Sequence, residues 1–247
     1  MSTTLTGKVA LVTGGSRGLG AAIAKRLASD GAAVAITYTS SPQKADEVVR
    51  VIESNRGRAV AIRADSADVD AVRNAVAETV KAFGGLDILV NNAGIATLAP
   101  IDEFKLAEFD RLIAVNVRAV FVAVQEAARH MKQGGRIINI GSVNSDLMPF
   151  AGGSVYALTK GAVASFTRGL ARDLGPRGIT VNNIQPGPVD TDMNPADGPF
   201  AETLKGLIAL GRYGQGDEVA AMVAYIASPE AAFVTGASLK IDGGFAA

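Results

Sequence analysis

Three side chains in the second half of the chain, Ser142, Tyr156 and Lys160, could together transfer a proton. Tyr156 and Lys160 are spaced i, i+4, so one helical turn would place them on the same face of a helix. A free tyrosine has a pKa of about 10, and a nearby ammonium favours the phenolate. Such a tyrosine could give a proton to the alkoxide that develops during hydride transfer to a carbonyl. The Tyr-x-x-x-Lys spacing is common by chance, however, and alone it is also typical of a half-buried aromatic beside a surface cation.

A glycine-rich stretch near the N-terminus could bind a phosphate group. It reads Thr13-Gly14-Gly15-Ser16-Arg17-Gly18-Leu19-Gly20 and lies between an apolar run and an alanine-rich segment. Glycines let the backbone turn tightly and approach a pyrophosphate, whose charge interacts favourably with the positive end of a following helix. A tight β-α turn without a ligand is the alternative, but the position in the first β-α unit favours a dinucleotide. The expected cofactor-binding residues of this turn are Gly14, Ser16, Arg17, Gly18, Leu19 and Gly20.

The same stretch also matches the G-x-S-x-G pattern of serine hydrolases, through Gly14, Ser16 and Gly18. Ser16 would then be the nucleophile, and the lone His130 would have to be its base. This alternative leaves the Ser, Tyr and Lys set unexplained.

The cofactor preference is predicted from the segment that follows the second apolar run. A site selective for NAD usually has an acidic residue there, which binds the ribose 2′-hydroxyl. This chain has the segment Thr37-Tyr38-Thr39-Ser40-Ser41 instead. Hydroxyls can hydrogen-bond a 2′-phosphate that a carboxylate would repel, and Arg17 could add a charge-assisted bond. We therefore predict NADP(H) as the preferred cofactor, with NAD(H) as the alternative and with Tyr38, Thr39 and Ser40 as contacts.

Short β-rich runs that alternate with segments of helical periodicity must position these residues. Most runs are apolar throughout, which is typical of a parallel sheet covered on both faces. Repeated β-α units predict an α/β fold: a single-domain, doubly wound (Rossmann) parallel sheet of about seven strands with helices on both faces, and with ligands at the carboxyl ends of the strands. The expected strands are Val9–Val12, Val34–Thr37, Ala59–Ile62, Leu86–Val90, Arg136–Ile140, Thr180–Ile184 and Ser238–Ile241. Helical stripes begin at Ala45, Val69 and Val219.

No linker or internal repeat divides the chain, so residues 1–247 are interpreted as one dinucleotide-binding and catalytic domain. The segment Asp192–Gly211 is long for a loop and contains Pro195, Gly198 and Pro199. It is interpreted either as a mobile substrate lid or as an ordinary surface excursion with a short helix.

Composition narrows the class of protein. The 247 residues are 48% hydrophobic, which suffices for a sizeable core, and 24 basic residues balance 24 acidic ones. Without a basic stripe, nucleic acid is a poor candidate as a partner. The absence of cysteine excludes disulfides and cysteine-ligated metals, and the chemistry above needs no metal. Met1–Lys8 lacks an apolar signal core and no apolar stretch is long enough to span a bilayer, so a cytoplasmic enzyme without membrane contact is expected.

Taken together, the motifs resemble those of the short-chain dehydrogenase/reductase family over essentially the whole chain. The matching elements are Thr13-Gly14 with Gly18 and Gly20, Asn91-Asn92-Ala93-Gly94, Asn116, Ser142, Tyr156 with Lys160, and Pro186-Gly187. Their order and joint occurrence are highly specific.

The resemblance implies a role for each matching residue. Tyr156 would protonate the carbonyl oxygen, and Ser142 would hold that oxygen by a hydrogen bond. Lys160 would lower the pKa of the tyrosine and bind the nicotinamide ribose. Asn116 would kink its helix and hold a water that links Lys160 to solvent. The further cofactor contacts that the resemblance implies are Asp65 and Ser66 at the adenine, Asn92, Ala93 and Gly94 near the ribose, and Pro186, Gly187, Val189 and Thr191 at the nicotinamide amide.

Within the family, the chain is similar to 3-oxoacyl-carrier-protein reductases and to small ketone or alcohol reductases. Gln185 stands where a small residue is common, and Asn144-Ser145-Asp146 follows the serine. These departures predict a more polar substrate wall than that of an acyl reductase, and no basic cluster marks a docking site for an acidic carrier protein.

Two further expectations concern partners. Val115–Met131 is apolar on more than one side and Ala157–Ala171 is rich in small residues, so these helices are expected to form a subunit interface, and the resemblance implies a homotetramer. The small-molecule partner is expected to be a ketone or alcohol. A protein of this fold could instead bind a nucleotide or signalling dinucleotide without turnover, which is the alternative from a different functional class.

Overall fold

The computed structural model describes residues 4–247, in which seven strands form one parallel sheet. The first three residues of Met1–Lys8, the segment interpreted as lacking a signal core, lie outside the described part. The strand order is β3-β2-β1-β4-β5-β6-β7, and all neighbours pair in parallel. The order reverses between β1 and β4, which is where a doubly wound sheet opens a crevice for a ligand. The predicted fold class is confirmed.

The strands lie where the apolar runs predict them. Their bounds are β1 Val9–Val12, β2 Ala33–Tyr38, β3 Arg58–Arg63, β4 Ile88–Asn91, β5 Arg136–Ile140, β6 Thr180–Pro186 and β7 Ser238–Ile241. Two strands shift by two residues: β4 begins after the expected Leu86 because its pairing with β1 starts at Ile88, and β6 extends past the expected Ile184 because it pairs with β7 up to Pro186. Complete burial of β1, β4, β5 and β6 explains why these sequences show no polar alternation.

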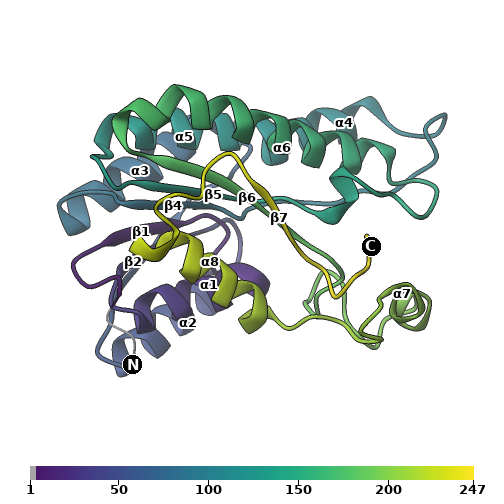
Figure 1. The fold of residues 1–247 in the computed structure, drawn as a ribbon, viewed down its shortest axis with the longest axis horizontal. Helices are drawn as coiled ribbons and strands as arrows, with labels where there is room; N and C mark the ends of the chain where they lie inside the picture. Colours follow the sequence, from purple (N-terminus) through teal and green to yellow (C-terminus); the bar gives the residue numbers. More distant parts are fainter. Residues whose placement is uncertain (1–3) are drawn as a thin grey trace.

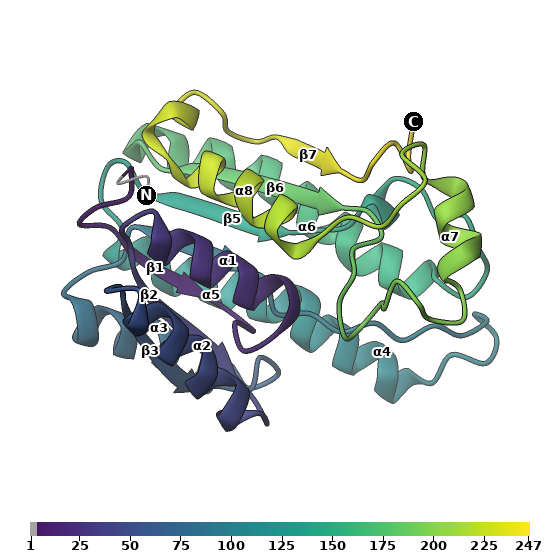
Figure 2. The same ribbon diagram turned by 90° about the horizontal axis from the view of Figure 1, so that it is seen from below.

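Helices cover both faces of the sheet (Figures 1 and 2). One face carries α1, α2 and α8, and the other carries α3, α5 and α6 (Figure 1). The helices are α1 Gly18–Ser29, α2 Pro42–Ser54, α3 Val69–Phe83, α4 Leu106–Ile113, α5 Ala119–His130, α6 Ser154–Leu174, α7 Ala201–Leu207 and α8 Gly216–Ala227. Short helical turns are η1 Ala114–Arg118, η2 Val143–Ser145, η3 Gly175–Arg177 and η4 Pro229–Ala231. None of the helices within residues 4–247 combines the length and the apolar character that a membrane span requires.

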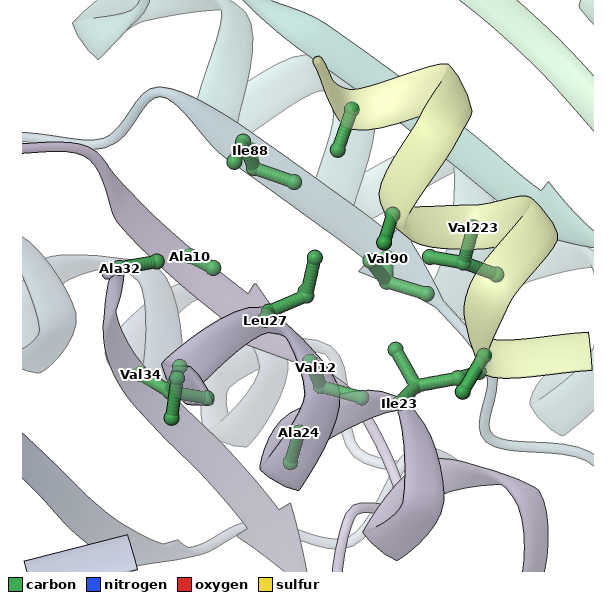
Figure 3. Packing of buried hydrophobic residues seen from close by; sticks show 14 of the residues in the cluster. Ala10, Val12, Ile23, Ala24, Leu27, Ala32, Val34, Ile88, Val90 and Val223 are labelled. Carbon is green, nitrogen blue, oxygen red and sulfur yellow. The ribbon is translucent and has the colours of Figure 1, made fainter. Parts of the chain in front are cut away.

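The core beneath α1 and α8 anchors the first β-α unit. Ile23 and Leu27 of α1 are fully buried and lie over Val12 and neighbouring strand residues, with Val223 of α8 beside them (Figure 3). Burial of one such side chain contributes roughly 1.5–3 kcal/mol. This packing holds the N-terminal end of α1 in place at the carboxyl end of β1.

The Asp192–Gly211 segment lies beyond the carboxyl ends of the strands and contains the short helix α7 (Figure 2). Ala201 and Ile208 of this segment are buried against Val143, Tyr213 and Phe245 in a small cluster of their own. This small cluster packs the segment against Val143, the residue that follows Ser142.

Candidate active site

A cleft of about 680 Å³ lies around the carboxyl ends of the central strands. Its lining comes from the glycine turn, the loops after β2, β3, β4, β5 and β6, the first turns of α6 and the Asp192–Gly211 segment. Of the expected site residues, the following line it: Gly14, Ser16, Arg17, Gly18, Leu19, Gly20, Tyr38, Thr39, Ser40, Asp65, Ser66, Asn92, Ala93, Gly94, Ser142, Tyr156, Lys160, Pro186, Gly187, Val189 and Thr191. Asn116 does not line the cleft, and its side-chain oxygen lies next to Gly94, which does.

Hydrogen bonds join the glycine turn to the loop after β4. The hydroxyl of Thr13 accepts the backbone N–H groups of Asn92 and Ala93, each at 3.0 Å. The side-chain amide of Asn92 donates to the carbonyl oxygens of Thr13 and Gly14, at 2.9 and 3.1 Å. A Cβ at Gly20 would lie 2.3 Å from the Gly14 oxygen, so this close approach requires a glycine. The matching motifs thus hold two strand ends together as well as lining the cleft.

The N-terminus of α1 fits a pyrophosphate. Its N-cap, Arg17, makes no side-chain capping bond, and the first turn has no acidic residue. The first helical bond runs from Ala21 N to Arg17 O, so the N–H groups of Gly18, Leu19 and Gly20 precede the hydrogen-bonded ladder. Gly14 and Gly18 have φ values of 64° and 51°, which favour glycine. This end of the helix offers donors and a positive dipole to an anion.

The loops after β2 and β3 lie side by side at the far part of the cleft. Ala64 N donates to Tyr38 O at 2.8 Å, and the hydroxyl of Thr39 donates to Ala64 O at 3.3 Å. Asp65 and Ser66, which continue this loop, line the cleft together with Tyr38, Thr39 and Ser40.

Tyr156 and Lys160 lie in the first two turns of α6, as their spacing predicts. Lys160 is only 7% exposed, and its ammonium donates to the carbonyl oxygen of Ile140 at 2.9 Å. The ammonium nitrogen lies 5.7 Å from the centre of the Tyr156 ring. A Cβ at Gly94 would lie 3.6 Å from this nitrogen, so the glycine keeps the floor of the cleft open beside it. A phenol and a buried cation therefore share one end of the cleft.

Asn116 occupies the π-helical turn η1, which joins α4 to α5. Its side-chain oxygen accepts Ile95 N at 2.9 Å, and its amide donates to Ile95 O and to the hydroxyl of Thr159, at 2.9 and 3.1 Å. The helix expected over Val115–Met131, with a kink at Asn116, is divided into η1 and α5, because these bonds favour a widened turn. Asn116 links the loop after β4 to the helix that carries Tyr156.

The hydroxyl of Ser142 makes two bonds to its near neighbour Asn144. It accepts Asn144 N and donates to the side-chain oxygen of Asn144, both at 3.1 Å. The amide nitrogen of Asn144 donates to Leu147 O at 3.0 Å, which fixes the orientation of the side chain. A ligand oxygen that approaches Ser142 would compete with Asn144 for the hydroxyl proton.

The expected polar substrate wall is largely wrong. Gln185 is completely buried, and its amide donates to the Ser145 hydroxyl at 2.5 Å, while that hydroxyl donates to Ser142 O at 2.9 Å. Asp146 lies 3.4 Å from the ammonium of Lys240. Of this group only Asn144 lines the cleft. Gln185, Ser145 and Asp146 do not line the cleft, because their hydrogen bonds stabilise the turn that follows β5.

The structure also removes the hydrolase alternative. His130 is the last residue of α5, lies 3.5 Å from a carboxylate oxygen of Glu126, and is not among the residues that line the cleft. It is the only histidine of the chain, so Ser16 has no imidazole base.

Several lining residues are not among the individually expected site residues, although Met148, Phe150, Met193 and Leu204 lie in the segments Ser142–Ser154 and Asp192–Gly211, from which the substrate pocket is expected to form. Arg111 of α4 and six apolar side chains also line the cleft: Leu98, Met148, Phe150, Met193, Leu204 and Phe245. No motif distinguishes any of them individually, and the fold brings Leu98, Arg111 and Phe245 to the cleft from outside those two segments.

Known proteins with this arrangement are numerous. A family model described as enoyl-(acyl carrier protein) reductase matches residues 14–246. The cyclic-di-GMP-binding biofilm dispersal mediator protein of Escherichia coli (strain K12) is 51% identical over 98% of each chain. A short-chain dehydrogenase/reductase from Serratia marcescens BCRC 10948 is 60% identical, with a TM-score of 0.98 over 99% of this chain and 100% of that one. A short-chain dehydrogenase from Burkholderia cenocepacia J2315, solved in complex with NADP, is 57% identical, with a TM-score of 0.98 over the same shares. By sequence, fold and the matching motifs, the chain belongs to the short-chain dehydrogenase/reductase family.

Proposed function

We propose that the protein is an NADP(H)-preferring oxidoreductase that interconverts a ketone and a secondary alcohol. Oxidoreductase chemistry is the activity that the family supports. The proposal of ketone and alcohol interconversion rests on one observation. Tyr156 and the buried Lys160 line the same cleft as Ser142 and the glycine turn.

Each residue of this set would have a distinct task. When bound, the nicotinamide supplies or accepts a hydride at the carbonyl carbon. Tyr156 gives its phenolic proton to the carbonyl oxygen during reduction and takes it back during oxidation. Ser142 turns its hydroxyl from Asn144 to the same oxygen and holds it by a hydrogen bond. Lys160 stabilises the phenolate by its charge, and two of its three N–H donors remain to bind ribose hydroxyls while the third is held by Ile140 O.

The same cleft supports the cofactor preference. The loop after β2 presents Tyr38, Thr39 and Ser40 in place of a carboxylate, and Arg17 lines the cleft at the start of α1. A 2′-phosphate would find hydroxyl donors and a guanidinium there. The structure from Burkholderia cenocepacia, which contains NADP, agrees with this assignment.

Turnover is the direct test. NADPH oxidation is followed at its absorbance maximum against ketones, keto esters and acyl thioesters, and NADH is compared at the same concentration. We expect ketone reduction with a higher kcat/KM for NADPH. Equal or better efficiency with NADH would contradict the cofactor preference, and inactivity with every carbonyl would contradict the enzyme assignment.

A second function is favoured by one observation, the similarity of the chain to the cyclic-di-GMP-binding biofilm dispersal mediator protein of Escherichia coli (strain K12). On this alternative, the cleft would bind a signalling dinucleotide without turnover. Calorimetric titration with cyclic di-GMP, in the presence and absence of NADPH, distinguishes the two. Tight cyclic di-GMP binding together with carbonyl inactivity would favour the binding protein, whereas a complete proton-transfer set with turnover favours the enzyme. The cytoplasmic location stays a prediction.

A further inference from the structure

A set of apolar side chains lines the same cleft as Ser142 and Tyr156. We call them the apolar wall: Leu98, Met148, Phe150, Met193, Leu204 and Phe245. They come from the loop after β4, the loop after β5, the Asp192–Gly211 segment and the C-terminal segment. Segments this distant in sequence converge on one surface only in the folded chain.

Contacts place three segments of the apolar wall, those of Leu98, Met148 and Phe245, near the proton-transfer residues. Ala99, which follows Leu98, donates its N–H to Gly152 O at 3.0 Å, just before α6 begins. A Cβ at Gly153 would lie 2.3 Å from the Met148 sulfur, so Met148 packs tightly against the start of the same helix. Phe245 packs in one cluster with Val143, the neighbour of Ser142. The wall therefore flanks the position that a reacting carbonyl would occupy.

Three members of the wall are largely open to solvent at the cleft. The exposed fractions are 55% for Leu98, 42% for Phe150 and 61% for Met193. Large apolar side chains that meet around an opening gain stability when an apolar group covers them. Met148 and Met193 are unbranched and flexible, so this surface can adapt to ligands of different shape.

Few polar groups near the wall are available to a polar substituent. Asn144 is bonded to Ser142 and Leu147, and the side-chain oxygen of Asn194 accepts the Tyr213 hydroxyl at 3.4 Å. Asp192, which precedes Met193, forms an ion pair with Lys44 at 2.9 Å.

Two cationic side chains outside the glycine turn line the cleft, Arg111 and Lys160. Lys160 belongs to the proton-transfer set. Arg111 is the group that would bind a carboxylate if the substrate were a keto acid. It extends from α4, an element that supplies none of the wall residues.

We propose that the substrate of the reduction is an uncharged ketone with an aryl or branched apolar group, which lies against the apolar wall. The inference rests on the proposed oxidoreductase function. In the reaction, hydride passes from NADPH to the carbonyl carbon, and the Tyr156 proton passes to the oxygen. The products are NADP+ and an uncharged secondary alcohol, and solvent returns a proton to Tyr156.

Three carbonyl compounds test this assignment: propiophenone, benzoylformate and hydroxyacetone. Propiophenone and benzoylformate are both phenyl ketones. The second substituent of the carbonyl is an ethyl group in propiophenone and a carboxylate in benzoylformate, while hydroxyacetone is small and polar. Initial rates of NADPH oxidation are measured for the wild type, Leu98→Asn, Arg111→Gln and the control Leu106→Asn. Leu106 is a suitable control because it is an exposed leucine of α4 that does not line the cleft.

We expect kcat/KM to be highest for propiophenone. Leu98→Asn should lower kcat/KM about 10-fold for propiophenone and change it less than about 3-fold for hydroxyacetone. The loss of one apolar contact with the substrate changes kcat/KM by about this factor. Leu106→Asn should change neither. A preference for benzoylformate that Arg111→Gln abolishes would overturn the proposal, as would a preference for hydroxyacetone or a Leu98→Asn variant as active on propiophenone as the wild type.

A binding measurement separates failure of this inference from failure of the proposed function. Saturation-transfer NMR of propiophenone is recorded with the NADPH-loaded wild type and with Leu98→Asn. If no carbonyl is reduced but propiophenone binds in a Leu98-dependent manner, the enzyme assignment fails and the apolar wall stands. Absence of binding to the wild type overturns the wall itself.

Discussion

At the scale of single residues, the burial of the Lys160 charge is the feature that calls for an explanation. An ammonium that loses its hydration is costly unless other groups compensate for it. The ammonium of Lys160 is held by the neutral carbonyl of Ile140 and lies near the Tyr156 ring, at the floor of the cleft. Packing alone would not favour a buried ammonium at this position. A Tyr156 phenolate and the hydroxyls of a bound ribose would both be stabilised by the ammonium.

Replacement of Tyr156 by phenylalanine removes the proton that the mechanism needs and leaves the ring in place. We expect kcat for ketone reduction to fall by about 10²–10⁴-fold, the usual contribution of a positioned acid or base. NADPH affinity, measured by fluorescence titration, should be retained. Tyr225→Phe is the matched control, because Tyr225 is exposed on α8 outside the cleft. Near-normal turnover of Tyr156→Phe would remove this residue from the mechanism.

Replacement of Arg17 by glutamine tests the 2′-phosphate contact. Loss of a charge-assisted bond of about 1.5–3 kcal/mol should lower kcat/KM for NADPH by roughly 10-fold or more, and leave NADH little changed. The ratio of the two efficiencies is the measurement. Lys25→Gln, an exposed cation of the same helix that does not line the cleft, should not alter the ratio. An unchanged ratio in Arg17→Gln would show that hydroxyl groups alone determine the preference.

At the scale of elements, the ends of helices position the cleft and its flanking segment. The widened turn η1 places Asn116 against Ile95, and the first residues of α1, which has no side-chain cap, line the cleft. The start of α8 fixes the end of the Asp192–Gly211 segment. Arg212 there forms a two-pronged ion pair with Glu218, at 2.9 and 2.7 Å, and Gln215 N donates to the same carboxylate at 2.8 Å.

These contacts predict a pH dependence of stability. The Arg212 guanidinium and the Gln215 N–H lower the pKa of Glu218 from 4.5 to about 2. A lowered folded-state pKa means that the contribution is complete above the unfolded value and is lost as the pH falls from 4.5 toward 2. Glu218→Gln should therefore lower the melting temperature at neutral pH, and its difference from the wild type should shrink within this window. Because the pair is exposed, added salt should reduce the difference as well.

Thermal melts by circular dichroism across this pH range provide the measurement. Asp217→Asn removes a carboxylate from the same helical turn without touching the Arg212 pair, and is the control. A Glu218→Gln difference that stays constant down to pH 2 would contradict the role of this carboxylate.

At the scale of the whole molecule, α5 and α6 present apolar side chains away from the sheet. Phe121 is 48% exposed and Leu158 is 51% exposed, and the Phe121 ring lies 6.1 Å from that of Phe166. The two helices run along the same outer face of the sheet (Figure 1). Exposed aromatic and aliphatic groups on neighbouring helices are typical of a subunit interface. The predicted homotetramer stays a prediction.

Light scattering of the purified protein at micromolar concentration tests the assembly. We expect the mass of a tetramer for the wild type and a smaller species for Phe121→Glu, because a carboxylate would be buried without a partner in the interface. Phe200→Glu changes an equally aromatic, exposed residue of the Asp192–Gly211 segment and should leave the mass unchanged. A monomeric wild type would contradict the predicted interface.

The sequence by itself determined the order of elements and the residues of the motifs. Strands that are buried on both faces are recognised from their own composition, and the bounds of the buried strands β1 and β5 match the predicted ones. The bounds of the partly exposed β7 match as well. The i, i+4 spacing of Tyr156 and Lys160 is likewise a local property of a helix. The expected residues of the glycine turn line the cleft because parallel strands bring their carboxyl ends to one edge.

The tertiary structure alone decided where the remaining polar and apolar side chains point. Gln185 and Ser145 turn inward to brace the loop after β5, and the apolar wall forms from four segments that share no spacing rule. A side chain's direction in a loop depends on partners far away in the sequence, whereas periodicity describes only neighbours along the chain. For this reason the proposed chemistry rests on the motifs, whereas the proposed substrate class rests on the fold.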